Sequence, residues 1–254
     1  MSQQRIDFLG IPLDTGAEIG TVCDLIGAGE HSKLVTFVNP HAWFIARRHP
    51  DYVERLRQMS LVLPDGQGVV WACRLLAGQP CRRLSFDMSS VADAFFKDVA
   101  AKGVTLMLVG GEPSVDEDVE AKLHIAYPAL KIFGTEHGYG EFAPKIGRLM
   151  ERKPQAVVVG MGSPRQEEFL IALRAAGYKG FAITCGGFFD QYLKADQYYP
   201  PWVDRFNLRF LWRLYREPRR LWRRYLIEYW YFVGAVLRVL AERGVARLKK
   251  VQMG

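Results

Sequence analysis

The sequence has few cysteines, and they form neither a disulfide framework nor a zinc site. The four are scattered, with no CxxC pair and no histidine at ligand spacing: Cys23, Cys73, Cys81 and Cys185. This pattern argues against both kinds of site and favours a reducing cytosol. The five histidines are expected to be surface or local polar residues, and no Asp-x-Asp pair stands at a predicted strand end. We therefore expect no metal and no cofactor.

The sequence also lacks a recognisable secretory leader and a run of apolar residues long enough to span a membrane. The first fourteen residues, MSQQRIDFLGIPLD, have no apolar core and no small-residue cleavage site, so we expect no signal peptide. The longest apolar run near the C-terminus is 229–237. Because a spanning helix needs about 20 apolar residues, this run cannot cross a bilayer unaided. It is suited to lying in the membrane interface.

Positive charge is concentrated at one end of the chain. The formal net charge is +7, but residues 203–250 alone hold eleven Arg and two Lys against four acidic residues, a net charge of +9. The rest of the chain therefore carries a net charge of −2. The chain is predicted to be a near-neutral domain followed by a strongly basic tail.

Over the first 200 residues, short apolar runs alternate with segments of helical periodicity. The predicted strands are 6–9, 34–38, 61–63, 104–109, 131–134, 156–159 and 181–184. Helical patterns lie between them, for example at 88–101 and 166–176. Strands alternating with helices are typical of an α/β domain with a mostly parallel sheet. We predict a Rossmann-like α/β fold.

A boundary is predicted at Pro200-Pro201, which cannot continue a helix. It divides the chain into an α/β catalytic domain of residues 1–199 and a C-terminal appendage of residues 200–254. The appendage is predicted to be helical, with an interruption near Pro218.

The appendage combines regularly spaced arginines with aromatic residues. Five arginines recur every three or four residues, as one stripe of a helix would: Arg209, Arg213, Arg216, Arg220 and Arg223. Four of the six tryptophans also lie here. A helix lying on an anionic membrane carries this combination, and each cation near the surface contributes about 1 kcal/mol of attraction. A solvated basic face and a nucleic-acid-binding tail are the alternatives, and the density of Trp and Tyr favours the membrane.

In an open parallel sheet, ligands bind beyond the carboxyl ends of the strands, and polar or glycine-rich segments follow several of the predicted strands. Asn39 follows strand 34–38 and suits a helix cap and a ligand contact about equally. Asp65 follows strand 61–63 in a Pro-Asp-Gly segment. A carboxylate there is suited to act as a general base, although on its own this segment reads more simply as an ordinary turn.

Two glycine-containing turns suit phosphate groups. Gly110 and Gly111 join a strand to a helix start, where backbone N–H groups attract anions, although a tight turn explains them nearly as well. After strand 156–159, Gly162 precedes Ser163, which is predicted to cap the next helix. Arg165 and Gln166 then project from the first turn of that helix, where phosphate and nucleotide recognition fits them better than a purely structural role.

Taken together, these segments resemble the WecG/TagA/CpsF family of bacterial glycosyltransferases. The matching stretches are TFVNPH (36–41), LVLPDGQGVV (61–70), MLVGGEP (107–113), VVVGMGSPRQEEF (157–169), CGGFFD (185–190) and LYREPRRLWRRYL (214–226). The resemblance extends over residues 34–226, and its motifs are specific in combination rather than singly.

The resemblance implies inverting, metal-independent transfer from a UDP-sugar to a sugar on a polyprenyl diphosphate carrier, in exopolysaccharide or cell-surface glycan biosynthesis. It makes Asp65 the general base and places Thr36, Asn39 and Gln166 in the donor or catalytic pocket. The C-terminal arginines would meet the lipid diphosphate and help to close the site: Arg213, Arg216, Arg220 and Arg223. The expected location is the cytoplasmic face of the bacterial inner membrane, as a peripheral protein.

One segment departs from the family pattern. Where the family usually has Arg-x-x-Gly-x-Asp, this chain has Arg82-Arg83-Leu84-Ser85-Phe86-Asp87. Ser85 replaces the glycine, so the backbone of this loop, and with it the accepted sugar, is expected to differ. Arg82 and Asp87 keep the pattern and are expected to bind substrate.

Two other functions are considered. A nucleotide- or nucleic-acid-binding regulator would use the basic appendage, but we expect no nucleic acid as a partner. A Rossmann-type oxidoreductase is disfavoured because no complete dinucleotide fingerprint follows a predicted strand. The residues decide neither the donor sugar nor the oligomeric state, so glucose is only a guess and a homo-oligomer is left open.

Overall fold

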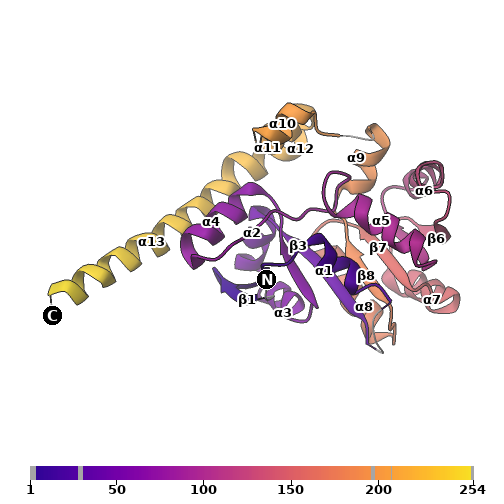
Figure 1. The fold of residues 1–254 in the computed structure, drawn as a ribbon, viewed down its shortest axis with the longest axis horizontal. Coiled ribbons are helices and arrows are strands. Elements are labelled where there is room, and N and C mark those ends of the chain that lie inside the picture. The colour runs from indigo at the N-terminus through magenta and orange to yellow at the C-terminus, as the bar shows by residue number, and fades with distance from the viewer. Residues whose placement is uncertain (1–3, 28–30, 196–197, 207, 253–254) are drawn as a thin grey trace.

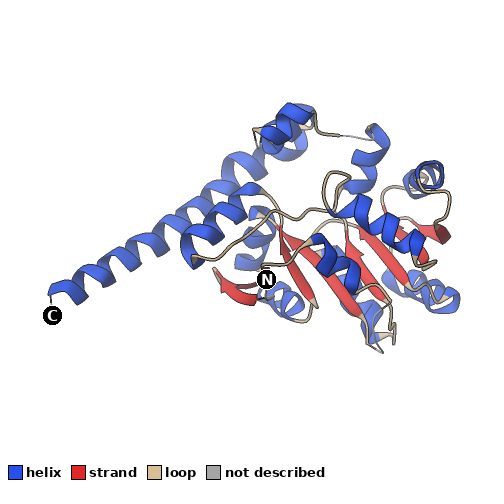
Figure 2. Ribbon diagram, in the orientation of Figure 1, coloured by secondary structure: helices blue, strands red, loops and turns tan. Residues whose placement is uncertain are grey.

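The computed structural model describes residues 4–27, 31–195, 198–206 and 208–252, with side chains described except at 220 and 244–252. Its main sheet has six strands, all parallel, in the order β4-β3-β8-β7-β5-β6. The strands are β3 (Lys33–Val38), β4 (Leu61–Pro64), β5 (Thr105–Gly110), β6 (Lys131–Glu136), β7 (Ala156–Gly160) and β8 (Phe181–Thr184). The predicted α/β fold with a mostly parallel sheet is confirmed (Figures 1 and 2).

Helices cover both faces of the sheet. One face packs under α1 (Ile19–Asp24), α5 (Val91–Ala101), α6 (Val115–Ala126) and α9 (Phe188–Lys194). The other packs under α2 (Pro40–Arg48), α3 (Pro50–Arg57), α4 (Gln67–Ala77), α7 (Phe142–Arg152) and α8 (Arg165–Ala175). Successive residues of a strand point to opposite faces, so Leu34 joins one core cluster and Val35 the other. Burial on both faces explains the nearly continuous apolar runs of the strands.

The first predicted strand lies outside this sheet. It forms β1 (Gln4–Phe8), which pairs antiparallel with β2 (Ile11–Thr15), a strand the sequence analysis missed. Asp14 joins this hairpin to β4, because its carboxylate accepts the N–H of Val62 at 2.7 Å and pairs with Arg5. Pro12 and Asp14 are residue types that strands usually avoid, and here a tertiary contact of Asp14 overrides that tendency.

The appendage is helical, as predicted. It consists of α10 (Pro201–Arg205), α11 (Arg209–Arg216), α12 (Pro218–Arg223), a π-helical segment η1 (Arg224–Glu228) and α13 (Tyr229–Gln252). The predicted interruption is confirmed, since α11 ends at Arg216 and α12 begins at Pro218. Among the described residues, no helix is both long enough and apolar enough to cross a membrane.

The start of α13 packs on the α/β core before the helix extends away from it (Figure 1). Phe232 and Val236 are buried in the same cluster as the residues of α2 and α4. The ring of Phe232 lies 5.4 Å from that of Trp43 and 6.3 Å from that of Phe8. This packing fixes where the appendage meets the sheet.

Candidate active site

The ends of two adjacent strands bring Asn39 and Asp65 to one edge of the sheet. Asp65 follows β4, and its backbone N–H donates to the carbonyl of Val38, the last residue of β3, at 2.8 Å. Asn39 caps α2 by accepting the N–H of Ala42 on its Oδ1 at 3.0 Å, which is one of the two roles that the sequence left open. The half-buried carboxylate of Asp65 lies at the carboxyl edge, where ligands of parallel sheets bind.

The charge of Asp65 acts on two buried tyrosines, Tyr199 just before the appendage and Tyr229 at the start of α13. Burial raises the pKa of both Tyr199 and Tyr229. In both phenols the cation of Arg213 lowers the pKa and the carboxylate of Asp65 raises it. Both charges act on the same two rings, so Arg213 of α11 and Asp65 each lie within electrostatic range of Tyr199 and Tyr229. The Nε of Arg213 is buried and has no hydrogen-bond partner.

A second arginine stands beside Arg213. The pKa of Arg224 is lowered by burial and then by the charge of Arg213, so the two guanidinium groups lie near each other. Two adjacent, poorly solvated cations repel each other and favour an anion between or beside them. Near them, His41 Nδ1 pairs with Glu228 Oε2 and joins α2 to η1. Burial lowers the pKa of His41, followed by the charge of Arg224.

Asp87 connects the loop after α4 to the appendage. Its Oδ2 accepts from Arg209 Nη1 at 2.6 Å, and Arg209 lies over the ring of Tyr199 at 4.3 Å. Arg82, by contrast, is three-quarters exposed, and its Nη1 lies 3.8 Å from Glu18. Of the two residues that keep the family pattern in this loop, the structure brings Asp87 to the appendage and leaves Arg82 at the surface.

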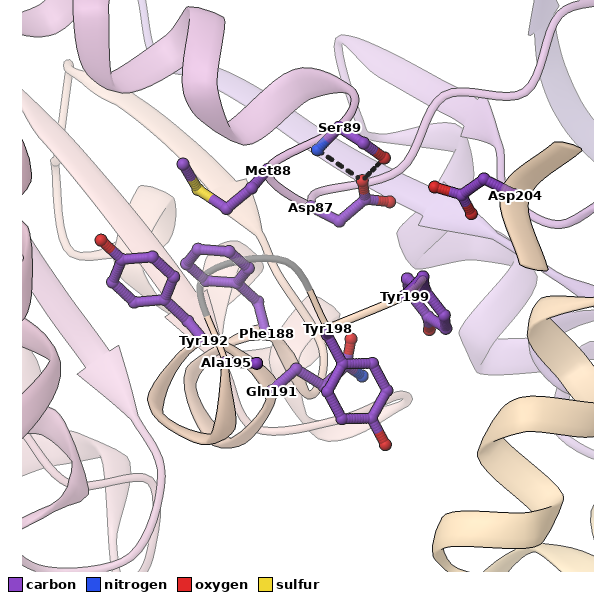
Figure 3. A pocket seen from close by; sticks show the side chains of 10 residues that line it. All are labelled: Asp87, Met88, Ser89, Phe188, Gln191, Tyr192, Ala195, Tyr198, Tyr199 and Asp204. Atoms are coloured by element: carbon purple, nitrogen blue, oxygen red, sulfur yellow. Dashed lines mark hydrogen bonds between the residues drawn. The ribbon is translucent and has the colours of Figure 1, made fainter. Parts of the chain in front are cut away.

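A small pocket of about 20 Å³, roughly the room that one water molecule needs, opens next to Asp87 (Figure 3). It is lined by Asp87, Met88, Ser89, Phe188, Gln191, Tyr192, Ala195, Tyr198, Tyr199 and Asp204. The rings of Phe188 and Tyr192 stack with centroids 5.3 Å apart and planes 17° apart. The space between these rings and the polar rim takes a water molecule, and a sugar would need more room than the described side chains leave.

The buried carboxyl of Glu167 is hydrogen-bonded to two of the predicted pocket residues, Thr36 and Gln166. Oε1 of Glu167 accepts from Thr36 Oγ1 at 2.8 Å, from Ser163 Oγ at 2.9 Å and from Gln166 Nε2 at 3.0 Å. Gln166 also accepts the N–H of Gly186 on its Oε1 at 3.2 Å. Thr36 of β3 is therefore bonded to α8, Gln166 of α8 is bonded to the loops that follow β7 and β8, and both side chains are buried.

Glu167 itself is fully buried, and burial raises its pKa. A carboxyl that keeps its proton to a higher pH in the folded chain than in the unfolded chain stabilises the fold at low pH. That stabilisation is lost as the pH rises through the folded pKa. The prediction that Ser163 caps α8 is wrong: α8 begins at Arg165, and the Ser163 hydroxyl bonds to the Glu167 side chain instead.

The glycines shape the neighbouring strand ends. A Cβ at Gly110 would lie 2.4 Å from the carbonyl oxygen of Gly160, so β5 and β7 approach closely only because no side chain is present. Gly111 and Gly162 have φ of +75° and +74°. Arg165 extends away from Asp65, donating to the carbonyl of Gly140 and lying 4.6 Å over the ring of Phe142.

The remaining arginines of the appendage are placed differently from Arg213. Arg216 and Arg223 are exposed and lie over Trp212 and Trp222 at 5.3 and 5.8 Å. Arg220 belongs to α12, but its side chain lies outside the described part of the structure. Among the described residues, no three His, Cys, Asp or Glu side chains gather in a way that could hold a metal ion.

Sequence reasoning did not assign to the site several residues that bond to the predicted ones or interact with them electrostatically: Arg83, Glu167, Tyr199, Arg209, Arg224 and Tyr229. The aromatic and basic density of the appendage was a signal, but it indicated a membrane surface and not contact with Asp65. Which of these residues turn inward depends on how the appendage packs.

Comparison with known proteins agrees with the arrangement of the motifs. The model of the glycosyl transferase WecG/TagA/CpsF family matches residues 6–245. The UDP-Gal:alpha-D-GlcNAc-diphosphoundecaprenol beta-1,4-galactosyltransferase of Shigella boydii is 26% identical over 205 residues, covering 79% of this chain and 84% of that protein. The N-acetylglucosaminyldiphosphoundecaprenol N-acetyl-beta-D-mannosaminyltransferase of Bacillus subtilis (strain 168) is 31% identical over 199 residues, covering 76% and 75%.

Proposed function

Because the chain belongs to the WecG/TagA/CpsF family and is a glycosyltransferase, we propose that it transfers a sugar from a UDP-sugar to a saccharide carried on undecaprenyl diphosphate. The relatives' names support both substrates, since they specify UDP-galactose as donor in one case and diphosphoundecaprenol-linked acceptors in both. The observation that carries the proposal for this chain is the half-buried carboxylate of Asp65 at the carboxyl edge of the sheet, together with Arg213, whose buried Nε has no hydrogen-bond partner and whose charge acts on the same two tyrosines as Asp65 does.

The chemistry is a single displacement with inversion, with Asp65 as the general base. Its carboxylate takes the proton of the acceptor hydroxyl as that oxygen attacks the anomeric carbon of the donor. The new glycosidic bond forms on the face opposite the leaving group. The bond from the anomeric carbon to the phosphate oxygen breaks, and UDP leaves with the electron pair. No step in this scheme is assigned to a metal ion.

Cationic side chains hold the diphosphate groups. Arg213 and Arg224 are desolvated and close together, so an anion bound there meets donors that need little reorganisation. The acceptor's diphosphate is the anion nearest to its reacting sugar, and Arg213, Arg216, Arg220 and Arg223 are proposed to meet it. Thr36, Asn39 and Gln166 stay proposed for the donor side, with Gly110, Gly111, Gly162 and Arg165 along the neighbouring strand ends. Arg82 and Asp87 stay proposed as substrate contacts.

The function is tested with a panel of donors against a short-chain polyprenyl-diphosphate sugar acceptor. The panel comprises UDP-glucose, UDP-galactose, UDP-N-acetylmannosamine and its uronic acid. We expect one donor to give UDP and an acceptor lengthened by one sugar of inverted anomeric configuration. Formation of the lengthened acceptor in the presence of a metal chelator would support a transfer reaction that needs no metal ion. No lengthened acceptor with any donor would contradict the proposed function.

The appendage is proposed to bind an anionic membrane surface as a peripheral contact on the cytoplasmic face. Exposed apolar side chains gather on it: Trp202, Phe206, Phe210, Leu211, Tyr215, Trp222, Leu226, Ile227, Trp230, Tyr231, Val233 and Leu237. Exposed arginines lie among them, including Arg216 and Arg223. Apolar rings and cations together favour the interface between lipid headgroups and acyl chains.

Replacing Trp222 and Trp230 together by serine should remove most binding to vesicles containing anionic lipid, because both side chains are about half exposed or more. Co-sedimentation with vesicles measures this. Ile125→Ser is the control, since Ile125 is 83% exposed on α6, away from the appendage. Unchanged vesicle binding by the double variant would contradict the proposed membrane contact. Tighter binding of the unmodified protein to DNA or RNA than to vesicles at the same salt concentration, measured by gel shift, would favour the alternative of a nucleic-acid-binding regulator.

A further inference from the structure

The residue that departs from the family pattern contacts the proposed base. Ser85 is buried, and its Oγ lies 2.5 Å from Oδ1 of Asp65. Both backbones are held in place. The N–H of Leu84 donates to the carbonyl of Pro64 at 2.9 Å, and the N–H of Asp65 donates to the carbonyl of Val38 at 2.8 Å. The loop after α4 is therefore fastened to the end of β4, and this brings the Ser85 hydroxyl to the carboxylate.

The direction of this hydrogen bond follows from the neighbour on the other side. Nη1 of Arg83 lies 2.9 Å from Oγ of Ser85. A guanidinium only donates, so Ser85 accepts from Arg83 and its own proton is left to be donated. The carboxylate of Asp65 is the acceptor at 2.5 Å. A hydrogen bond to a charged oxygen is shorter and stronger than a neutral one, as this distance indicates.

We propose that Ser85 is a positioning residue for the base: it holds Oδ1 of Asp65 and leaves Oδ2 to take the acceptor proton. This inference rests on the proposed function, because it requires Asp65 to act as the base. A hydrogen bond to one carboxylate oxygen restricts rotation of the group and so favours a fixed direction for the other oxygen. A glycine at position 85, as is usual in the family pattern, has no hydroxyl with which to do this.

The contact also connects Asp65 to the appendage. Nη1 of Arg83 lies 3.4 Å from Oδ2 of Asp87, and Arg209 of α11 donates to the same oxygen at 2.6 Å. Arg209 thus holds Asp87, Asp87 holds Arg83, and Arg83 sets the direction of the Ser85 hydroxyl. Docking of α11 on this loop therefore favours the orientation of Asp65 that Ser85 holds.

The test is steady-state kinetics of Ser85→Ala, Ser85→Gly and Ser85→Thr in the full-length protein, with a UDP-sugar donor that supports transfer. Ala and Gly should lower kcat about tenfold and leave the KM for the donor unchanged, because a mispositioned base slows the chemical step and not donor binding. Thr keeps the hydroxyl and should restore most of the loss. Ser60→Ala is the matched control, since it removes a hydroxyl that accepts the N–H of Leu34 at the far end of β4.

Thermal unfolding and UDP binding of each variant separate positioning from folding. An unchanged kcat in Ser85→Ala or Ser85→Gly would overturn the inference. So would an equal loss in Ser85→Thr or Ser60→Ala, a rise in KM alone, or failure of both the Ala and Gly variants to fold. The proposed function fails independently if the unmodified protein lengthens the acceptor with none of the donors, and the assignment of the base fails if Asp65→Asn retains normal turnover. An inactive Asp65→Asn beside a fully active Ser85→Ala would overturn only the role of Ser85.

Discussion

Asp65→Asn is expected to lower the rate of sugar transfer by about 10²- to 10⁴-fold, which is the usual contribution of a general base. Asparagine keeps the shape of the side chain and still accepts the hydrogen bond from Ser85, but its amide cannot take a proton. The fold and the affinity for UDP should be nearly unchanged, because the backbone N–H of Asp65, not its side chain, is bonded to β3. The rate of transfer is measured by product formation, the stability of the fold by thermal unfolding, and the affinity for UDP by calorimetry.

Asp51→Asn provides the matched control for Asp65→Asn. Asp51 is exposed on the first turn of α3, so the same chemical change there should leave transfer unaltered. If Asp65→Asn turned over at the rate of the unmodified protein, Asp65 would not be the base. If it lost UDP binding and folding together with activity, the carboxylate would be structural.

Arg213→Met is expected to lower kcat/KM about 10²-fold, the usual loss when one donor to a developing charge is removed. Stability should not fall with it. The Nε of Arg213 is buried without a hydrogen bond and Arg224 repels the guanidinium, so its burial costs free energy that the nearby charge of Glu217 offsets only in part. Methionine fills a similar volume without that cost. An unchanged or higher melting temperature combined with lost activity would mark Arg213 as a ligand-binding residue.

The control for Arg213→Met is Arg205→Met, which removes an exposed arginine from α10 in the same appendage. It should leave transfer to a short-chain acceptor in solution unchanged. A large fall in melting temperature of Arg213→Met would contradict the interpretation, because it would mean that the guanidinium stabilises the appendage instead of awaiting an anion.

Periodicity located the strands well and their pairing poorly. All seven predicted strands exist, because buried parallel strands are short apolar runs between helical segments. The first of them pairs in a hairpin outside the main sheet, since partner choice depends on tertiary contacts such as that of Asp14 with β4. The predicted capping role of Ser163 was wrong for a similar reason: the buried carboxyl of Glu167 on α8 takes its hydroxyl.

The sequence by itself determined the fold class, the positions of polar residues after the strands, and an appendage that is basic, aromatic and helical. These follow from local rules: the alternation of strand faces, helix periodicity, and proline as a breaker. Only the tertiary structure decided that Ser85 faces Asp65, that Arg213 turns inward while Arg216 stays exposed, and that Glu167 holds Thr36 across 131 residues of sequence. Such contacts depend on how the connecting helices and loops and the appendage pack on the sheet. A local pattern of residue types does not specify that packing.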